Sequence, residues 1–414
     1  MSKKSILMGS NMSLILATGI APAIVHQSAY ANTLTGLIPD LYAGMDVVSR
    51  ELVGMVPSVS RDSTAERAAV GQTVTSHISK PKTAVNIVPA MQVPEPRDTD
   101  RGIVSMTLTD AKKVEFGYTG EEQRGLNSGP GAMSVQADEF AQGLRTLVNM
   151  IEAAGCVETA RGASRAAGAA GTTPFTTDLS DSALLRQILD DNGAPSSERS
   201  LIGNTNMGVK LRSQTQLTKA NEAGTTMTLR QGELLDLHGF SIKESAGIVN
   251  HTKGTTTNAT TNAAGYAVGA TVITLAAVAG GGSIVAGDVI TFAGDTNKYV
   301  VDSGDADTTD GGTITLAEPG LRVAIAASAT AITVGANYAA NVGFSRNAIQ
   351  LAMRAPALPQ GGDLAIDRMM ITDPRSGMTF EVALYAGYRM ISAEVSAVWG
   401  WKAVKPEHIA LLLG

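Results

Sequence analysis

The first hydrophobic pattern along the chain is helical. Apolar residues recur at spacings of three and four between residues 32 and 56, at Leu37, Leu41, Met45, Val48 and Leu52. This spacing places them on one face of a helix. Pro57 follows, and we expect the helix to end there because the residue before a proline disfavours helical backbone.

The next stretch predicts short edge strands and then a charged hairpin. Apolar positions alternate weakly between residues 58 and 93, and Pro81 and Pro89 interrupt them; proline cannot donate to a ladder and favours sheet edges. From Glu95 to Arg124 charge is dense around alternating Val104, Met106 and Leu108. We predict a long, solvated β-hairpin here, projecting from the body; a solvated surface face is a compatible reading.

The clearest helix runs from Ser134 to Ala154. Ser134 is suited to cap it, and acids in the first turn suit the helix dipole. Its apolar stripe contains five residues, Phe140, Leu144, Leu147, Val148 and Ile151. The small residues from Gly162 to Gly171 predict either a fraying helix end or a linker.

Residues 178–250 read as mixed α/β. Ser180 is expected to cap a helix through Leu184 and Ile188 that ends at Asn192-Gly193. Short alternating segments follow around Met227-Leu229 and Phe240-Ile242.

Composition changes at His251. To about Gly343 charges are sparse and Thr, Ala and Gly dominate. Four short β-rich runs recur between Gly and Asp clusters, at residues 271–275, 288–292, 313–316 and 331–334. This pattern is typical of an all-β barrel or sandwich, and we predict a domain inserted in the chain.

The α/β character returns after Phe344. Residues 347–351 and 369–371 are expected to be buried strands. A body that is interrupted and then resumed implies that residues 178–250 and 344–414 form one domain.

Composition narrows the class of protein. Of 414 residues, 44% are hydrophobic and 17% charged, which excludes wholesale disorder. Aromatic residues make up only 4%, and 44 glycines indicate many turns and small-residue β structure. The net charge of -6 disfavours bulk DNA binding, which requires a basic surface.

The N-terminus allows two readings. Lys3 and Lys4 precede an apolar run from Met12 to Val25, and Ala29-Tyr30-Ala31 is similar to a signal-peptidase site. The other reading is an apolar arm that packs on a neighbour, and Pro22 inside the run favours it. No other stretch reaches the roughly 20 apolar residues that a membrane-spanning helix needs.

No motif predicts an enzyme. Phosphate-binding, zinc-protease, nucleophile-elbow and dinucleotide motifs are absent from the sequence. Asp302, Asp305, Asp307 and Asp310 are close enough in sequence to hold Ca²⁺, but the EF-hand order is missing and a solvated turn is favoured. His238 is expected to be a packing residue and Cys156 a small buried hydrophobe. We therefore expect no metal and no cofactor.

Three stretches resemble a known family. Asn32-Thr33-Leu34 with Leu41 and residues 47–50 is similar to an N-arm helix. Residues 287–294 are similar to a Gly-Asp-x-Ile-x-Phe-x-Gly strand, and Arg389, Trp399-Gly400-Trp401 and residues 404–407 to a C-terminal strand and turn. With the order of parts, the chain resembles major capsid proteins of tailed bacteriophages, which have the Hong Kong 97 capsid fold. It looks most like coat proteins of Salmonella-type short-tailed phages.

The resemblance implies an α+β fold with a spine helix, an extended β-hairpin loop, an axial α/β domain and an inserted small β-barrel. The expected parts are an N-terminal arm (1–73), strands with the charged loop (74–128), the spine helix (129–177), the axial domain (178–250), the barrel (251–343) and a return to the axial and peripheral domains (344–414).

The implied function is self-assembly into an icosahedral shell around double-stranded DNA, without sequence-specific DNA binding and without a membrane. The resemblance also implies pentamers and hexamers of the chain, scaffolding and portal partners, and assembly in the bacterial cytoplasm. The charged stretch supplies the expected inter-subunit contacts, namely Arg97, Asp98, Arg101, Lys112, Lys113, Glu115, Glu121, Glu122 and Arg124.

Two further hypotheses remain open. Some members of this fold cross-link a Lys to an Asn with Glu assistance, for which Lys112 or Lys113 would serve. The competing class is a secreted β-rich surface or adhesive protein, which the signal-like N-terminus and the Thr/Ala/Gly-rich repeats favour.

Overall fold

The computed structural model describes residues 52–79, 84, 86–89, 91–92, 101–127, 132–219, 234, 236–278, 281–373 and 377–414. The expected signal peptide, nearly all of the helix expected at 32–56 and the segment at Met227-Leu229 lie outside these residues. Pro57 does not follow a helix directly; it lies within the short 3₁₀ helix η1 (Val56–Ser58).

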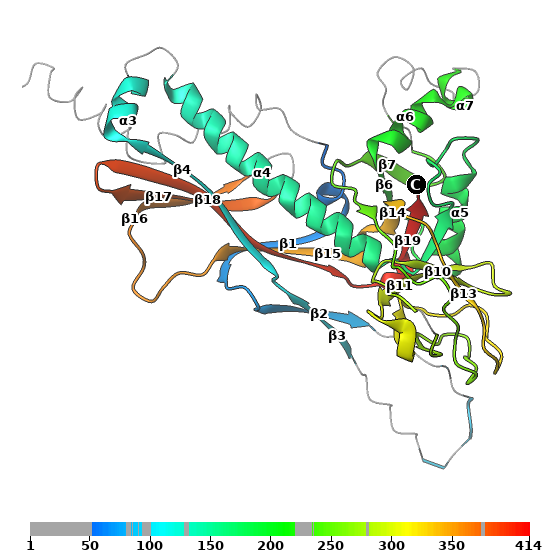
Figure 1. Cartoon of the computed structure of the whole chain (residues 1–414). Helices are drawn as coiled ribbons and strands as arrows, with labels where there is room; N and C mark the ends of the chain where they lie inside the picture. Colours follow the sequence, from blue (N-terminus) through cyan, green and yellow to red (C-terminus); the bar gives the residue numbers. More distant parts are fainter. Residues whose placement is uncertain are drawn as a thin grey trace, which may run out of the picture.

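One half of the molecule is an elongated arm in which a long helix lies along a sheet (Figure 1). The helix is α4 (Ala132–Arg161). The arm sheet has six strands: β1 (Ser60–Ala68), β4 (Asp110–Thr119), β15 (Ile349–Pro356), β16 (Ala365–Thr372), β17 (Thr379–Gly387) and β18 (Met390–Ala403). β1 and β15 are parallel, and the other pairs are antiparallel.

Alternation along the strands of the arm sheet decides which face α4 covers. Phe380, Val382 and Leu384 of β17 belong to the same buried cluster as the apolar stripe of α4. Glu381 and Tyr385, between and beside them, point to the opposite face because side chains alternate along a strand. The helix stripe expected from the sequence is confirmed, and α4 extends past Ala154 to Arg161 and begins before Ser134.

The charged stretch does not form a hairpin with itself. β3 (Arg101–Thr107) pairs with β2 (Thr73–Ser79), so the hairpin is built one strand earlier in the chain than expected. β4 instead pairs along its full length with β18. The physical reason is that Val114, Phe116 and Tyr118 alternate with charged residues and give β4 an apolar face, which packs beneath α4. α3 (Gly120–Asn127) follows β4.

The other half contains an eleven-stranded sheet. One part of it runs in the order β5 (Arg165–Gly168), β19 (Ile409–Leu413), β14 (Tyr338–Ser345), β6 (Arg199–Gly203) and β7 (Phe240–Glu244). β7 ends this order, and β8 (Asn250–His251) pairs with β14. Helices α5 (Ser180–Asp191), α6 (Thr205–Ser213) and α7 (Thr215–Thr218) lie beside it (Figure 1).

Two local expectations in this half are wrong. The small residues after Gly162 form neither a fraying helix nor a linker: β5 is a buried strand that pairs with β19 and with β11 (Lys298–Ser303). Ser180 is the first residue of α5 rather than its cap, and it bonds to Asp178.

Residues 251–343 form the expected short strands with a core of their own. The four β-rich runs match β9 (Val272–Leu275), β10 (Val289–Phe292), β12 (Gly312–Leu316) and β13 (Ile332–Val334). Twelve buried residues, including Phe292, Tyr299 and Ile314, make the core. The hydrogen-bond ladder is nevertheless continuous with the neighbouring sheet, because Lys298 of β11 pairs with Ala166 of β5. 3₁₀ helix η2 (Thr308–Asp310) lies in this segment.

The returning segment begins with η3 (Arg346–Ala348), so the expected strand at 347–351 starts two residues later, at Ile349. η4 (Pro406–His408) connects β18 to β19. None of the helices described is both long enough and apolar enough to cross a membrane.

Candidate assembly surfaces

A buried carboxylate on α4 holds the N-terminal side of the described chain. Glu152 is 2% exposed. Its Oε1 accepts hydrogen bonds from the backbone N–H of Gly54 at 2.8 Å and Met55 at 2.6 Å, and its Oε2 accepts one from Val56 at 2.9 Å. The Ser245 hydroxyl donates a fourth, at 2.7 Å. One side chain therefore fixes residues 54–56 to α4 and to the segment after β7.

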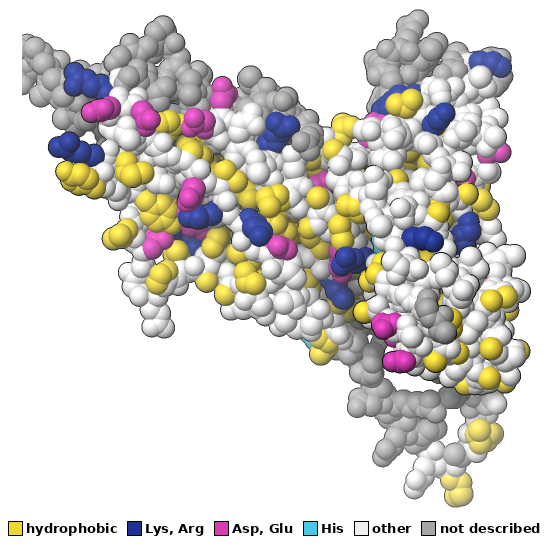
Figure 2. Space-filling model, viewed as in Figure 1, with side chains coloured by type: hydrophobic (Ala, Val, Ile, Leu, Met, Phe, Trp, Pro, Cys, Tyr) yellow, Lys and Arg dark blue, Asp and Glu magenta, His cyan; other side chains and the backbone are white. Residues whose placement is uncertain are grey.

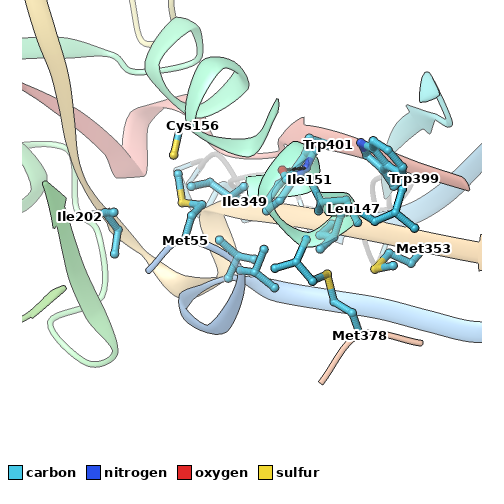
Figure 3. Packing of buried hydrophobic residues seen from close by; sticks show 14 of the residues in the cluster. Met55, Leu147, Ile151, Cys156, Ile202, Ile349, Met353, Met378, Trp399 and Trp401 are labelled. Atoms are coloured by element: carbon cyan, nitrogen blue, oxygen red, sulfur yellow. Dashed lines mark hydrogen bonds between the residues drawn. The ribbon is translucent and has the colours of Figure 1, made fainter. Parts of the chain in front are cut away.

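The surroundings of Glu152 are closely packed. A Cβ on Gly54 would lie 2.7 Å from the carbonyl oxygen of Glu244, so only glycine fits there. Figure 3 shows Met55 beside Ile151, Cys156 and Ile349 in the core. On the other side of residues 54–56, the Lys243 ammonium donates to the Ser58 hydroxyl at 2.9 Å, and burial lowers the pKa of Lys243. Residues 54–56 are therefore held at a fixed point of the body.

Sequence reasoning missed Glu152, although a signal existed. Glu152 follows Val148 by four residues and so falls on the apolar stripe of α4. A carboxylate that faces the core is unfavourable unless it is paired or hydrogen-bonded, so an acid at such a position indicates buried donors around it.

Gly155 on α4 and Gly162 directly after the helix set the distance between α4 and β18. A Cβ on Gly155 would lie 2.5 Å from the Trp401 ring, and one on Gly162 would overlap Cβ of Ala403. The Trp401 indole N–H donates to the Ile151 carbonyl oxygen at 3.0 Å, which fixes the ring under the helix (Figure 3). The rigidity of the arm thus depends on helix–sheet contact at these glycines.

We expect Gly155→Ala to destabilise the chain by about 2 kcal/mol, because overpacking of a filled core costs about 1–3 kcal/mol. Gly143→Ala is the matched control on the same helix. Its Cβ would meet Val114 at an ordinary 3.5 Å, so helix propensity is expected to stabilise it by up to about 1 kcal/mol. Urea unfolding of both variants checks this, and equal effects would contradict the close approach at Trp401.

The hairpin of β2 and β3 carries a projecting loop, defined here by the described residues 84, 86–89 and 91–92 between its strands (Figure 1). Its base is anchored on the face of the arm sheet that α4 does not cover, where Met106 and Leu108 pack with Ala352 and Val398. Leu108 also exchanges backbone hydrogen bonds with Gly71 and Gln72, both at 2.9 Å.

The projecting loop exposes apolar side chains. Ile87 is 97% exposed, Val88 72% and Met91 106%, and Figure 2 shows hydrophobic side chains at the end of this loop. Three large apolar residues held away from the body are typical of a surface that packs on another molecule. The sequence predicted a charged contact here instead: Arg97 and Asp98 lie outside the described residues, and Arg101 is the first residue of β3.

Lys113 and Glu115 of β4 lie on the face of the arm sheet opposite α4, because they alternate with Val114 and Phe116. The Lys113 ammonium lies 2.7 Å from Glu115 Oε2 and 3.3 Å from Glu394 Oε2, and hydrogen bonds to these two carboxylates raise the pKa of Lys113. Lys112 is exposed, and its position in the strand places it on the same face as Val114. The structure therefore brings Lys113 and Glu115 together and separates Lys112 from them.

The remaining charged candidates lie on α3. Glu122 accepts hydrogen bonds from the backbone N–H of Thr119 at 2.9 Å and from its hydroxyl at 3.0 Å, and these bonds lower the pKa of Glu122. Glu122 thus caps the turn between β4 and α3. Glu121 and Arg124 are exposed on the same helix.

Further ion pairs cross the arm sheet on this face. The Glu381 side chain is 4% exposed, and its carboxylate forms ion pairs with two arginines. Oε2 lies 2.8 Å from Arg67 Nη1, and Oε1 lies 3.0 Å from Arg368 Nε. Arg368 also bonds Asp363, which lowers the pKa of Asp363. Burial, together with a hydrogen bond to Asp363, raises the pKa of Tyr385 to about 12. These contacts tie β1, β16 and β17 together.

The Asp363 contact predicts an acid dependence. The folded-state pKa of Asp363 lies below its ordinary value of 3.8, so the contact stabilises the fold above about pH 4 and is lost as pH falls through the folded pKa. Asp363→Asn is expected to lower the melting temperature slightly at pH 7 and not at all at pH 2. Thermal unfolding at both pH values checks this, and an equal deficit at both would contradict it.

The free end of the arm is apolar. Leu364, Ile366, Tyr388 and Met390 are exposed, and they come from the start of β16 and the β17–β18 turn, which the strand register brings to the same end of the sheet. Figure 2 shows hydrophobic side chains gathered at this end. The arm therefore offers apolar contact surface at its end as well as on the projecting loop.

The residues considered for metal binding or catalysis make local contacts in the structure. Asp305 and Asp307 accept backbone hydrogen bonds within their own turn, at 3.0 Å each, and no cluster of metal-ligating residues occurs among the described residues. His238 bonds the Ser182 hydroxyl at 2.7 Å but is exposed, so the expectation of a packing residue is wrong. Cys156 is buried, and burial raises the pKa of its thiol well above the ordinary value.

No protein-family model and no curated protein matches the chain. Among solved structures, it is similar to the capsid of the cyanophage P-SCSP1u, with 12% identity over 88% of this chain and 89% of that one and a TM-score of 0.47. It is similar to a chain of Mycobacterium phage Che8, with 12% identity, coverage of 88% and 92%, and a TM-score of 0.44. It is also similar to a virus-like particle from Pyrococcus furiosus, with 11% identity, coverage of 90% and 96%, and a TM-score of 0.39.

Proposed function

We propose that this chain is the structural major capsid protein of a tailed phage, which self-assembles into an icosahedral shell that encloses double-stranded DNA. The observation that carries the proposal is the projecting loop, whose apolar side chains are held away from a rigid body (Figures 1 and 2). Self-association is the way such a chain buries these side chains.

The architecture supports a shell subunit. Contact at Trp401 and Ala403 holds α4 against the arm sheet, and Glu152 fixes residues 54–56 to α4. We infer that the arm is the peripheral domain, and that the eleven-stranded half forms the axial domain around five-fold and six-fold positions, with residues 251–343 as its insertion. Residues 1–73 would supply the N-terminal arm.

The proposed partners are further copies of the chain as pentamers and hexamers, a scaffolding protein and a portal, with assembly in the bacterial cytoplasm. The role is structural rather than catalytic. The chain's net charge of -6 suits a wall that does not bind DNA phosphates tightly. In this scheme Arg97, Asp98 and the charged residues of β3, β4 and α3 set the register between neighbours, because exposed ion pairs contribute little affinity.

Sedimentation velocity of the purified full-length chain tests the proposal. We expect a rapidly sedimenting population that grows with concentration or on addition of a scaffolding protein. A single species of about 42.6 kDa under all these conditions would overturn it.

A further inference from the structure

β4 forms an open edge of the arm sheet. Its ten residues pair with β18 on one side, and no strand among the described residues pairs with the other. Ala111, Lys113, Glu115 and Gly117 on this strand are all exposed. A long edge with free backbone groups is a template for pairing with another chain.

The ladder shows which backbone groups face outward. The Gly120 N–H donates to the Arg389 carbonyl oxygen at 3.0 Å, in the same register as the β4–β18 pairs. Bonding alternates along an antiparallel strand, so the even-numbered residues 110–118 bond to β18 and the odd-numbered residues face away. Thr119 agrees with this, because its N–H bonds Glu122 instead of β18. Residues 111, 113, 115 and 117 therefore present their backbone groups at the open edge.

We propose that two copies of this chain pair β4 to β4 in antiparallel orientation, about a two-fold axis at Val114. In this register Lys113 lies opposite the second copy's Glu115, and Glu115 lies opposite the second copy's Lys113. Ala111 lies opposite Gly117 in the same way. The two copies use the same surface, as a two-fold contact requires.

Charge selects this register over its neighbours. Only the outward-facing, odd-numbered residues can form hydrogen bonds across the edge, so an odd-numbered residue must lie opposite another odd-numbered residue. The two-fold axis can therefore lie at any one residue of β4, and neighbouring registers move it by one residue. An axis at Lys113 places the two lysines opposite each other, and an axis at Glu115 does the same with the two glutamates. Like charges directly opposite destabilise a strand pair, whereas opposite charges stabilise it. Self-complementary charge argues for a second copy as the occupant of the edge.

The inference rests on the proposed self-assembly and names one of its contacts. Within a single chain, Lys113 and Glu115 already lie 2.7 Å apart, with 54% and 62% of their side chains exposed. Both are therefore available to a second copy without unfolding any part of β4.

Charge reversal in the full-length chain tests the pairing. Lys113→Glu places only glutamates at the edge, and Glu115→Lys places only lysines there, so each variant alone is expected to form at least tenfold less assembled particle than wild type in sedimentation. An equal mixture combined before assembly restores complementary pairs and is expected to recover the yield. Within each chain, the contact between residue 113 and Glu394 is the same whether that variant is alone or in the mixture. Recovery in the mixture therefore reports pairing between chains and not folding of each chain.

A disulfide provides the second measurement. In the proposed register, Val114 lies opposite Val114 of the second copy. The two residues form a non-hydrogen-bonded pair of the antiparallel ladder, with Cα atoms about 4.5 Å apart, and this distance suits a disulfide. Oxidised particles of Val114→Cys are expected to give a covalent dimer on non-reducing gels. Lys112→Cys is the control, because residue 112 of one copy and residue 112 of the second copy are four residues apart along the strands, about 13 Å.

If the wild-type chain assembles, three results would overturn the pairing. The first is that each single charge reversal assembles like wild type, and the second is that the mixture of the two reversals does not recover the yield of particles. The third is that oxidised Val114→Cys particles contain no covalent dimer. Failure of the wild-type chain to assemble at all would instead contradict the proposed function.

Discussion

Replacing Glu152 with alanine is expected to lower the free energy of unfolding by about 4 kcal/mol. The carboxylate accepts three backbone hydrogen bonds and one from Ser245, all inside the core. A buried donor that loses its partner costs about 1–3 kcal/mol, and local relaxation recovers part of the sum. Urea unfolding of the unassembled chain measures the change.

Glu158→Ala is the matched control, since Glu158 lies on the same helix and is only half-buried. Its effect is expected to stay below about 1 kcal/mol. Limited proteolysis should also cleave Glu152→Ala faster near residues 54–56, because those backbone groups lose their anchor. If Glu152→Ala unfolds within 1 kcal/mol of wild type, the carboxylate does not hold this segment.

Ile87→Asp is expected to abolish shell formation while the subunit keeps its stability. Ile87 is 97% exposed in the single chain, so a charge there costs the monomer nothing. In an assembled shell the same side chain would be buried against a neighbour, where an unpaired carboxylate is strongly unfavourable. Electron microscopy of the assembly reaction, with thermal unfolding of the monomer, measures both effects.

Asn86→Asp introduces the same charge one residue earlier, at an exposed polar position. It is expected to leave assembly close to wild type. Equal assembly of Ile87→Asp and wild type would show that the projecting loop does not pack on a neighbour.

Periodic segments were predicted best from the sequence. The stripe of α4 and the four β-rich runs between residues 271 and 334 match elements of the structure, because their apolar residues follow the period of the element and face one core. The α+β class follows from these elements. The extension of α4 beyond Ala154 was missed because its packing uses Gly155, which helix propensity disfavours and the approach of β18 requires.

Pairing between distant strands was not predictable from local pattern. The charged stretch contains strands in the expected places, but the partner of β4 is β18, some 280 residues later. Local alternation identifies a strand and its apolar face, and it does not identify the neighbour. The same limit applies to β5, whose small residues carry no strand signal and are buried because β11 and β19 lie on either side.

Which residues make the contacts between subunits stays a prediction. Sequence reasoning expected contact through charged residues, of which the structure brings Lys113 and Glu115 together on one face of β4 and places Lys112 on the other. The apolar contact surface was read as weak strand, because Ile87 and Val88 are β-formers beside Pro89. Only their position beyond the β2–β3 ladder shows that they have nothing to pack on within the described part of the chain.

Negative-stain electron microscopy of the purified chain, alone and with a scaffolding protein, tests the central claim most directly. The account predicts closed shells, or tubes and spirals of the same wall, built from rings of five and six subunits that contain the full-length chain. Uniform small particles under every condition, with Ile87 still accessible to solvent, would contradict it.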